Sequence, residues 1–443
     1  MRSSKDFTIA IVGGGIVGLL CAIGLAQEGI TVDVFEAAAK YGEIGAGIGI
    51  GANALRVLKD LGILAQIKAR SESMQSTQNS IEFMRGTEPH NMIYEYPEQD
   101  DLKGLGFHRA AFLDILAGLL PDKVHSHFKK RCTSVLQDAD ERVRLGFSDG
   151  SEHVADLVIG ADGIKSAIRA QVFGADGDRL VDTGTVAYRA LVPVQRLRAA
   201  GVKEEFLKPM PRGYLGEEKH IIITNIMGGA VFNVAACTTD FARVMSPAGS
   251  QASWAAWVES ASPAEILAAF SDFGPELRKI IEGAEGANKW AIHGLYPPLK
   301  EHVASAKDGV QSEDGGVVGK RNVVLIGDSA HAMLPHLGSG ASVGIEDAYV
   351  LKSLLSHPQT ERANLSDVLR AYSQVRVPRA QYVTIASKRA GDIYQGHGPS
   401  GPSDAQRRSD LDLQWDEIWR YDANEEVSQA VKILEEGGFF QHE

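Results

Sequence analysis

The sequence predicts an α/β protein with a discontinuous parallel-sheet domain, a second β-sheet domain and a helical C-terminal segment. Three observations carry this prediction. The chain begins with a strand, a glycine turn, a helix and a strand; two later apolar runs end in turns of glycine and aspartate; and residues 181–240 alternate in short strand-like runs. With 443 residues, 44% of them hydrophobic, the chain can form more than one compact unit.

The first unit spans the N-terminal strand, helix and second strand. Residues 7–12 are apolar and predict a strand, and residues 16–28 are rich in Leu and Ala, which favours a helix that ends at Gly29. Residues 31–35 are rich in β-branched side chains and predict a second strand, which runs into Glu36. This order is that of a β–α–β unit, from which parallel sheets are built.

Two later runs are expected to join the same sheet. Residues 155–159 end at the turn 160–163 (GADG), and residues 322–326 end at the turn 327–328 (GD). Strands that end in such turns suggest one domain assembled from distant segments, each adding a strand. The expected domain comprises residues 1–75, 100–180 and 290–375.

The middle and the end of the chain have different sequence patterns. Short alternating runs, such as 186–188 and 220–224, predict a second sheet that covers a substrate. The expected substrate domain comprises residues 76–99 and 181–289, and a helical segment comprises residues 376–443. Residues 304–319 are rich in glycine and charge and predict an exposed loop.

Composition disfavours several classes of partner. The net charge of -12 argues against nucleic acid and anionic membrane surfaces, so an anionic substrate would need a local cation. Cys21, Cys132 and Cys237 are too few and too scattered for a disulfide framework or a metal cluster, and we expect no metal and a reducing, cytoplasmic location. Glycines interrupt the apolar N-terminal run, which argues against a signal peptide, and no segment has the apolar length of a membrane span.

The turn at residues 13–18, GGGIVG, predicts a dinucleotide site. It follows a strand and opens a helix, so Gly13, Gly15 and Gly18 let the backbone approach a pyrophosphate at the positive end of that helix. Glu36, which follows the second strand, can accept hydrogen bonds from ribose hydroxyls. This pattern alone does not choose between NAD and FAD.

Later motifs favour FAD over NAD, because they resemble motifs of flavoproteins. Residues 162–169, DGIKSAIR, resemble the DGxxSxxR element of flavoprotein monooxygenases, and residues 327–331, GDSAH, resemble their GD motif. Residues 107–109, FHR, resemble their arginine segment. Residues 338–342, GSGAS, open a helix whose start would stabilise negative charge on a reduced flavin. The four motifs stand in the family's order, so coincidence is a poor explanation.

From residue 9 to about residue 399, the chain resembles the group A FAD-dependent aromatic hydroxylases of the p-hydroxybenzoate hydroxylase type. Residues 45–56, 328–336 and 386–394 are similar to the members that hydroxylate salicylate. The sequence departs from their pattern in a longer loop at 304–319 and at the helix start, where Ser342 and Val343 replace a more polar, Asn-containing sequence.

The resemblance implies a single-component monooxygenase. NAD(P)H would reduce the flavin, O2 would add to give a flavin C4a-hydroperoxide, and a small phenolic acid would be hydroxylated. Salicylate would give catechol with loss of carbon dioxide. The residues expected to bind FAD are Gly13, Gly15, Gly18, Glu36, Gly49, Arg109, Asp162, Asp328, Gly340 and Ala341.

Residues that could serve the substrate follow from its chemistry. A benzoate needs a cation, and Arg189, at the start of the second domain, offers a planar fork that matches a carboxylate; a surface or interdomain ion pair is the alternative. His336, after Pro335 in the turn expected to face the flavin, could help to deprotonate a phenol, or could simply be packed. His220 is a weaker candidate and could be structural.

Other functions remain open at this point. Another phenol, such as 3-hydroxybenzoate, a urate-like heterocycle or a polyketide intermediate, could be the substrate. A non-catalytic binding protein like the GDP-dissociation inhibitors would keep the glycine turn but would not need the DG and GD motifs. A flavin halogenase is disfavoured because the chain lacks a Trp-x-Trp-x-Ile-Pro segment, and a plain NAD-dehydrogenase because a second nucleotide motif is absent. The chain is expected to act as a monomer or a homodimer.

Overall fold

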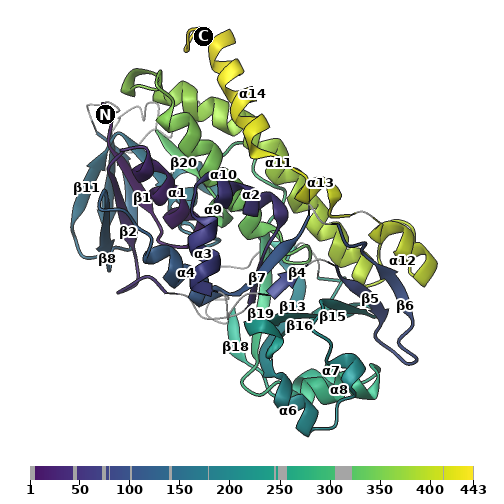
Figure 1. Cartoon of the computed structure of the whole chain (residues 1–443). Coiled ribbons are helices and arrows are strands. Elements are labelled where there is room, and N and C mark those ends of the chain that lie inside the picture. Colours follow the sequence, from purple (N-terminus) through teal and green to yellow (C-terminus); the bar gives the residue numbers. More distant parts are fainter. Residues whose placement is uncertain are drawn as a thin grey trace.

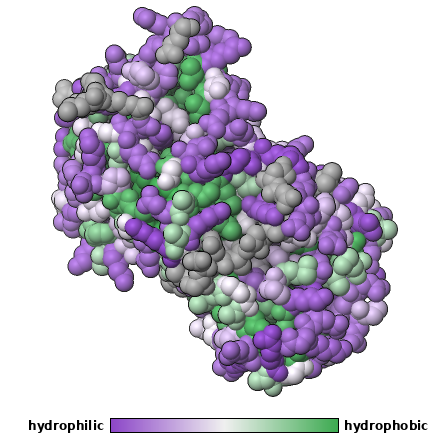
Figure 2. Space-filling view, in the orientation of Figure 1, coloured by the Kyte–Doolittle hydropathy of each residue, from purple (hydrophilic) through white to green (hydrophobic). Residues whose placement is uncertain are grey.

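The computed structural model describes residues 5–42, 47–71, 76–78, 80–99, 102–138, 142–177, 179–243, 246–247, 257–304, 322–412 and 414–442. These residues form two lobes, a larger one that carries both ends of the chain and a smaller one made mostly from its middle (Figure 1). The face shown in Figure 2 is mostly hydrophilic, and hydrophobic residues come to the surface mainly in its middle part.

A parallel sheet forms the base of the larger lobe. In spatial order its strands are β20 (Val323–Leu325), β12 (Leu157–Gly160), β1 (Ile9–Val12), β2 (Val32–Glu36) and β8 (Val124–Phe128). All neighbouring strands run parallel. The strands predicted at residues 155–159 and 322–326 therefore lie in one sheet with the first β–α–β unit.

Both faces of this sheet are covered. Ile9 of β1 packs in the core that contains α1 (Ile16–Gln27) and α10 (Gly340–Ser356). The next residue, Ala10, packs in a separate core against an antiparallel sheet. That sheet consists of β9 (Cys132–Gln137), β10 (Val143–Phe147) and β11 (Glu152–Ala155). Because both faces are buried, the parallel strands read as continuous apolar runs in the sequence.

The smaller lobe is built on a second, mostly antiparallel sheet. Its strands are β5 (Glu82–Arg85), β6 (Met92–Glu95), β13 (Leu180–Pro193), β14 (Arg212–Leu215), β15 (Lys219–Ile226), β16 (Val231–Thr239), β17 (Ser246–Pro247), β18 (Val258–Ser260) and β19 (Asn288–Leu295). The helices of this lobe are α6 (Val194–Ala199), α7 (Pro263–Ala269) and α8 (Pro275–Glu282), and their apolar residues share one core with β13, β15 and β16. The predicted second sheet is thus present.

A small sheet and several helices complete the larger lobe. The small sheet consists of β3 (Gly47–Ile50), β4 (Ser76–Gln78) and β7 (Gly104–His108). The helices are α2 (Ala52–Asp60), α3 (Leu64–Ser71), α4 (Arg109–Ala117), α5 (Ala167–Gly177) and α9 (Asp328–His331). Short 3-10 turns lie at Glu204–Phe206, Met227–Gly229 and Arg362–Asn364.

The C-terminal part is helical, as predicted. Its helices are α11 (Leu365–Tyr394), α12 (Asp404–Leu411), α13 (Asp416–Trp419) and α14 (Ala423–Glu436). The long α11 runs down to the smaller lobe, and α14 returns to pack along α10 and α11 in the larger one (Figure 1). Among the described residues, no helix is long and apolar enough to cross a membrane. The loop predicted at 304–319 lies, except for Ala304, outside the described residues, as do residues 45 and 46 of the segment 45–56.

Candidate active site

The glycine turn after β1 is packed too closely for side chains. Gly13 has a φ of +110°, and a Cβ there would lie 2.2 Å from the carbonyl oxygen of Ala161. A Cβ on Gly18 would lie 2.1 Å from the carbonyl oxygen of Gly13. Gly15 precedes α1 without a side-chain cap, so the first N–H groups of that helix remain available to an anion. The predicted turn is therefore present, with its backbone donors exposed to a ligand.

A cavity of about 410 Å³ opens beside this turn. Glu36 lines it, and its two carboxylate oxygens accept hydrogen bonds from the N–H groups of Gly14, at 2.8 Å, and Ala38, at 2.7 Å. Each oxygen keeps a lone pair that can accept from a ribose hydroxyl. Arg131 and Lys165 line the same cavity. Backbone donors, cations and the carboxylate of Glu36 together suit a nucleotide with its phosphates.

Asp162 also lines this cavity, but its carboxylate is engaged by the start of α5. It accepts hydrogen bonds from Ser166 Oγ at 2.5 Å and from the N–H of Ala167 at 2.8 Å. Arg169, which is fully buried, donates to the carbonyl oxygen of Ser329 at 3.0 Å. The DGxxSxxR element therefore joins the cavity wall to α5 and α9. A helix-capping contact is a role for Asp162 that the motif alone did not indicate.

The GD turn follows β20 and faces the start of α10. Gly327 has a φ of +64°, which favours glycine. The Asp328 side chain is exposed, and one of its oxygens lies 4.0 Å from the position of a Cβ built on Gly340. No hydrogen bond to this carboxylate occurs within the described part of the chain. The start of α10, at Gly340 and Ala341, has no side-chain cap, so its N–H groups face the same space as Asp328.

These groups fit FAD. The glycine turn and the start of α1 can hold a pyrophosphate, and Glu36 can hold a ribose. The exposed carboxylate of Asp328 can accept hydrogen bonds from the hydroxyls of a ribityl chain. The uncapped start of α10 can stabilise negative charge on a flavin ring.

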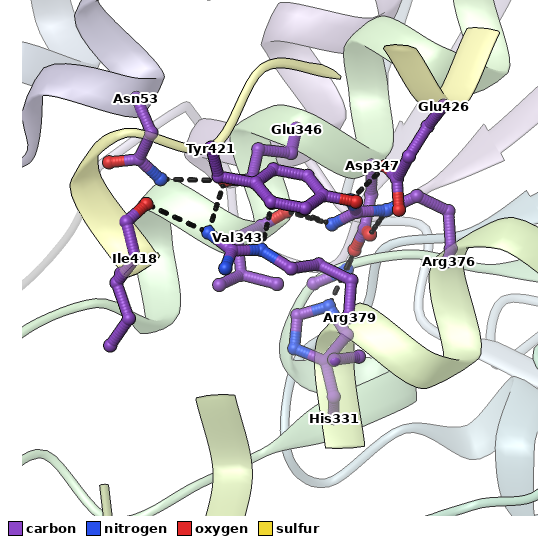
Figure 3. A network of polar contacts seen from close by, with 12 residues as sticks. Asn53, His331, Val343, Glu346, Asp347, Arg376, Arg379, Ile418, Tyr421 and Glu426 are labelled. Carbon is purple, nitrogen blue, oxygen red and sulfur yellow. Dashed lines mark hydrogen bonds and ion pairs between the residues drawn. The ribbon is translucent and has the colours of Figure 1, made fainter. Parts of the chain in front are cut away.

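Behind the GD turn lies a buried polar network (Figure 3). Asp347 Oδ2 accepts a hydrogen bond from the N–H of Gly327 at 2.8 Å and lies 2.5 Å from His331 Nε2. Asp347 Oδ1 accepts from Arg376 Nε at 2.8 Å. Burial alone would raise the pKa of Asp347, but the charges of His331 and Arg376 overcome this effect and hold the pKa below its usual range. The ionised carboxylate therefore fixes the backbone of the turn that carries Asp328.

The same network joins the C-terminal helices to α10. Arg376 pairs with Glu426 of α14, and it donates to Glu346 at 3.1 Å and to the carbonyl oxygen of Val343 at 3.0 Å. Arg379, further along α11, donates two hydrogen bonds to Glu346, at 2.9 and 3.1 Å. All four charged side chains are buried. Removal of one partner would leave an uncompensated buried charge, so the network is expected to be indispensable to the fold around it.

A second cavity, of about 190 Å³, lies between the larger lobe and the second sheet. Alternate residues of three strands form its floor: Ala187, Arg189, His220, Ile222, Thr224, Asn233, Ala235 and Cys237. The intervening residues, such as Tyr188 and Ile221, point to the core with α7 and α8. Gly49 of β3 and the loop 335–338, which leads to α10, form other walls. The cavity is mainly apolar, as expected for a site that holds a small organic ligand.

Arg189 is the cation of this pocket. Its guanidinium has no hydrogen bond or ion pair with any described residue, so the alternative of an interdomain ion pair is not observed. Burial lowers the pKa of Arg189, nearby Cys237 opposes the change, and Arg109 lowers the pKa further. Arg109 is the first residue of α4 and does not line either cavity. A desolvated cation without an anion is unfavourable, and an anionic ligand would relieve this.

His336 and His220 lie side by side in the same pocket. Their ring centroids are 5.2 Å apart with the rings steeply inclined, and the ring of Tyr394 lies 5.3 Å from that of His220. A Cβ on Gly391 would lie 2.3 Å from His336 Cδ2, so this glycine of α11 makes room for the imidazole. Burial lowers the pKa of His336 to about 4 and the pKa of His220 well below its usual value. Both rings are therefore neutral at neutral pH and can accept a hydrogen bond.

The loop that carries Pro335 and His336 is fixed by α11. Ser387 Oγ donates a hydrogen bond to the carbonyl oxygen of Leu334 at 2.5 Å and accepts one from the N–H of Leu337 at 3.3 Å. The structure thus brings Arg189, His220, Pro335 and His336 into one pocket, with Gly49 in its wall.

Sequence reasoning missed the pocket residues of the C-terminal segment. Tyr394, Trp415 and Trp419 all line the pocket, far along the chain from its strands. The two tryptophans stand one helical turn apart in an acidic stretch, and that spacing is a signal of a buried apolar stripe. Nothing in the local sequence shows which surface such a stripe covers.

Comparisons with known proteins point to one group. A family described as an FAD binding domain matches residues 6–187 and 318–387. A salicylate hydroxylase from Pseudomonas putida is 36% identical and covers 99% of this chain and 98% of its own. A 6-methylsalicylate 1-monooxygenase from Aspergillus terreus is 30% identical and covers 98% and 94%. A solved structure of a salicylate hydroxylase substrate complex has a TM-score of 0.81 and 31% identity, and covers 97% and 98%.

Proposed function

The chain belongs to the family of FAD-dependent aromatic monooxygenases, and from this premise we propose that it converts salicylate to catechol with NAD(P)H and O2. In this reaction one atom of O2 enters the ring, the carboxyl group leaves as carbon dioxide, and the other oxygen atom leaves as water. NAD(P)H provides the two electrons. The observation that carries the proposal is Arg189, which pairs with none of the described residues and lies in an apolar pocket beside two neutral histidines.

Arg189 binds the carboxylate of the substrate in this proposal. Strand β13, which carries Arg189, is separated by β16 from β15, which carries His220. Two strand spacings amount to roughly 10 Å between these backbones. The side chains rise from the same face of the sheet into one pocket, so the neighbouring carboxylate and hydroxyl groups of a single aromatic ring can approach Arg189 and the histidines respectively. The planar guanidinium can hold the carboxylate through two hydrogen bonds.

The histidines orient the phenolic hydroxyl. His336 is held neutral by burial, with a pKa of about 4, so it is a hydrogen-bond acceptor throughout the neutral pH range. At neutral pH the imidazole is unprotonated. It can therefore accept a hydrogen bond from the phenolic hydroxyl, and this bond strengthens as the hydroxyl becomes more acidic during attack on the ring. His220 has a partner in Gln395, whose Nε2 lies 3.2 Å from its Nδ1. We assign the first contact with the substrate to His336 and a supporting role to His220.

The cofactor assignments follow the same division of the site. Bound FAD supplies the electron transfer from NAD(P)H and the activation of O2. We propose that Gly13, Gly15 and Gly18 form the pyrophosphate cradle with the start of α1, and that Glu36 binds the ribose. Other proposed contacts with FAD are those of Gly49, Arg109, Asp162, Asp328, Gly340 and Ala341.

The main alternative is another small phenolic acid. The relative that acts on 6-methylsalicylate favours this alternative, because it covers nearly the whole chain at 30% identity. The same contacts would hold such a substrate, with the additional group accommodated by the apolar wall. The three cysteines are all free and buried, which suits the reducing cytoplasm that we propose as the location.

A substrate panel tests the proposal. The purified protein should carry noncovalent FAD that acid precipitation releases. Salicylate, 6-methylsalicylate, 3-hydroxybenzoate and unsubstituted phenol would each be added with NADH or NADPH, and the rate of NAD(P)H oxidation would be recorded. We expect the largest stimulation with salicylate and little with phenol, which lacks the carboxylate. Equal stimulation by phenol would contradict carboxylate recognition, and a colourless protein that FAD cannot reconstitute would contradict the whole assignment.

A further inference from the structure

We propose that Trp415 and Trp419 form an aromatic wall that limits the substrate to a single ring. This inference rests on the proposed function and adds the residues that limit the ring size of the substrate. Both indole side chains line the substrate pocket. Trp419 is the last residue of α13 and Trp415 directly precedes this helix, in the C-terminal segment that the FAD-binding family match, ending at residue 387, does not include. We call these two side chains the aromatic wall.

The wall is a continuous packed surface. The rings of Trp415 and Trp419 are stacked, with centroids 5.6 Å apart and an angle of 24°. Tyr96 packs edge-on against both, at 5.3 and 5.4 Å. The ring of Phe83 is stacked with that of Trp415, with centroids 5.9 Å apart. Each tryptophan is therefore supported by other aromatic rings, and neither can rotate away from the pocket without opening a void in this cluster.

A hydrogen bond fixes the wall to the loop that carries Pro335 and His336. Trp415 donates its indole N–H to the carbonyl oxygen of Leu337 at 3.2 Å. Leu337 follows His336, so the wall and the histidine belong to one connected unit. The other tryptophan lies against the end of β3, because a Cβ on Gly51 would come within 3.0 Å of the Trp419 ring. The wall therefore joins two sides of the pocket.

The backbone of α13 is fixed as well. Arg56 of α2 donates to the carbonyl oxygens of Trp419, at 2.5 Å, and Tyr421, at 2.8 Å. Arg379 donates to the carbonyl oxygen of Ile418 at 3.0 Å, and Arg379 is itself held by Glu346 of α10. Two buried or partly buried arginines thus secure the last carbonyl groups of this short helix. A wall held in this way discriminates by size, because it cannot yield to a larger ligand at low cost.

The volume that the two indole side chains occupy is the reason for a limit on the ring size of the substrate. In a protein interior, a cavity of about 150 Å³ can take up a benzene ring. Truncation of one indole would open space of this order next to the pocket. A hydroxynaphthoate has the same carboxylate and hydroxyl as salicylate and carries one more fused ring. It is therefore the natural probe for the wall.

The experiment compares the two ring sizes in the holoenzyme. For the wild type, Trp419→Ala and Trp419→Phe, we would measure kcat/KM and the dissociation constants of salicylate and 1-hydroxy-2-naphthoate, the latter from changes in the flavin absorption spectrum. We expect the wild type to prefer salicylate, and Trp419→Ala to shift the preference toward the naphthoate by roughly 10-fold or more, the usual scale of size discrimination in an apolar pocket. Trp419→Phe should lie between the two.

A matched control removes an aromatic side chain outside the pocket. Phe439 lies near the end of the same C-terminal segment and is 42% exposed. Phe439→Ala should leave the ratio of the two substrates unchanged. The FAD content and the melting temperature of each variant show whether it is folded. A folded Trp419→Ala enzyme with the wild-type ratio of dissociation constants would overturn the proposal.

The proposed function and the aromatic wall can be contradicted separately. A wild-type enzyme that binds and oxidises neither compound contradicts the proposed function and the wall together. A wild-type enzyme that turns over salicylate, with an unchanged ratio in both tryptophan variants, contradicts the wall alone. If Trp419→Ala binds FAD poorly, Trp419→Phe provides the same comparison with a smaller change in packing.

Discussion

In the proposed function, Arg189 binds the charged group of the substrate. The chain as a whole carries a net charge of -12, yet the pocket contains a guanidinium with no anion paired to it in the described structure. A second arginine, Arg109, is near enough to lower its pKa. This local cationic character is what an anionic substrate requires in an acidic protein.

Substitution of Arg189 tests this point. Loss of a charge-assisted pair from a desolvated pocket costs about 2–5 kcal/mol. Arg189→Ala should therefore lower kcat/KM for salicylate by roughly 30- to 5000-fold. Lys should rescue only part of the activity, because a point charge does not reproduce the bidentate fork. The control is Arg196→Ala, which removes an exposed arginine paired with Glu285.

The same substitution should have little effect on a neutral phenol, and FAD should stay bound. An equal decrease for salicylate and phenol would mean that Arg189 serves the reaction or the fold. No decrease for either would mean that another group binds the carboxylate.

The lowered pKa of His336 predicts that the stability of the folded protein depends on pH. Its pKa is lowered from 6.5 to about 4 in the folded protein, so the folded state favours the neutral ring and the unfolded chain binds the proton more readily. This contribution is fully present above pH 6.5 and is lost as the pH falls toward 4. Between about pH 7.5 and about pH 5 the expected loss is about 2 kcal/mol.

Urea unfolding of the wild type and His336→Gln at these two pH values measures the effect. Other groups titrate in both proteins, so only the difference between them reports on His336. The wild type should lose more stability than the variant. Parallel losses in the two proteins would show that the imidazole is not held neutral.

At the scale of elements, the central feature is the connection between the GD turn, α10, α11 and α14. Asp347 fixes the backbone N–H of Gly327, and Arg376 links Asp347 to Glu426. Asp328 stands on the turn that this network holds. The position of the proposed contact between Asp328 and the ribityl chain therefore depends on residues that are not themselves proposed to contact the cofactor.

Arg376→Met tests the network. The replacement keeps an extended side chain but leaves buried carboxylates without their cation, and breaking such a pair destabilises a protein by about 3–5 kcal/mol. Arg370 lies on the same helix and forms an exposed pair with Asp367, so Arg370→Ala should change stability by only about 0–1 kcal/mol. Urea unfolding of the holoprotein and the FAD dissociation constant are the measurements. Equal effects of the two substitutions would contradict the role of the network.

The elements also show which features the sequence could predict. The parallel strands were predictable because burial on both faces makes them apolar runs, and because each ends at a turn of glycine and aspartate. The capping of α5 by Asp162 was not predictable from the motif, since a carboxylate in a turn can serve either a ligand or a helix start. Arg189 and His336 could be named from residue type and position as groups that serve one substrate, but their burial and their neighbours in the pocket could not.

At the scale of the whole molecule, the C-terminal segment completes the site. It was predicted as helical, and the sequence showed its tryptophans, yet their place in the pocket depends on α11 carrying the chain from one lobe to the other (Figure 1). Such contacts join residues hundreds of positions apart, and local periodicity contains no information about them. The grouping of residues 376–443 as a separate unit remains a proposal. In the folded chain, Trp415 lines the pocket, and Glu426 belongs to the buried polar network behind the GD turn.

The most direct test of the central claim is the stoichiometry of the reaction with salicylate. The holoenzyme would be incubated with salicylate, NAD(P)H and O2, and catechol, carbon dioxide and oxidised nicotinamide would be quantified together. The account predicts equal amounts of the three, with hydrogen peroxide as a minor product. NAD(P)H oxidation that yields hydrogen peroxide without catechol, or a hydroxylated product that retains the carboxyl group, would contradict it.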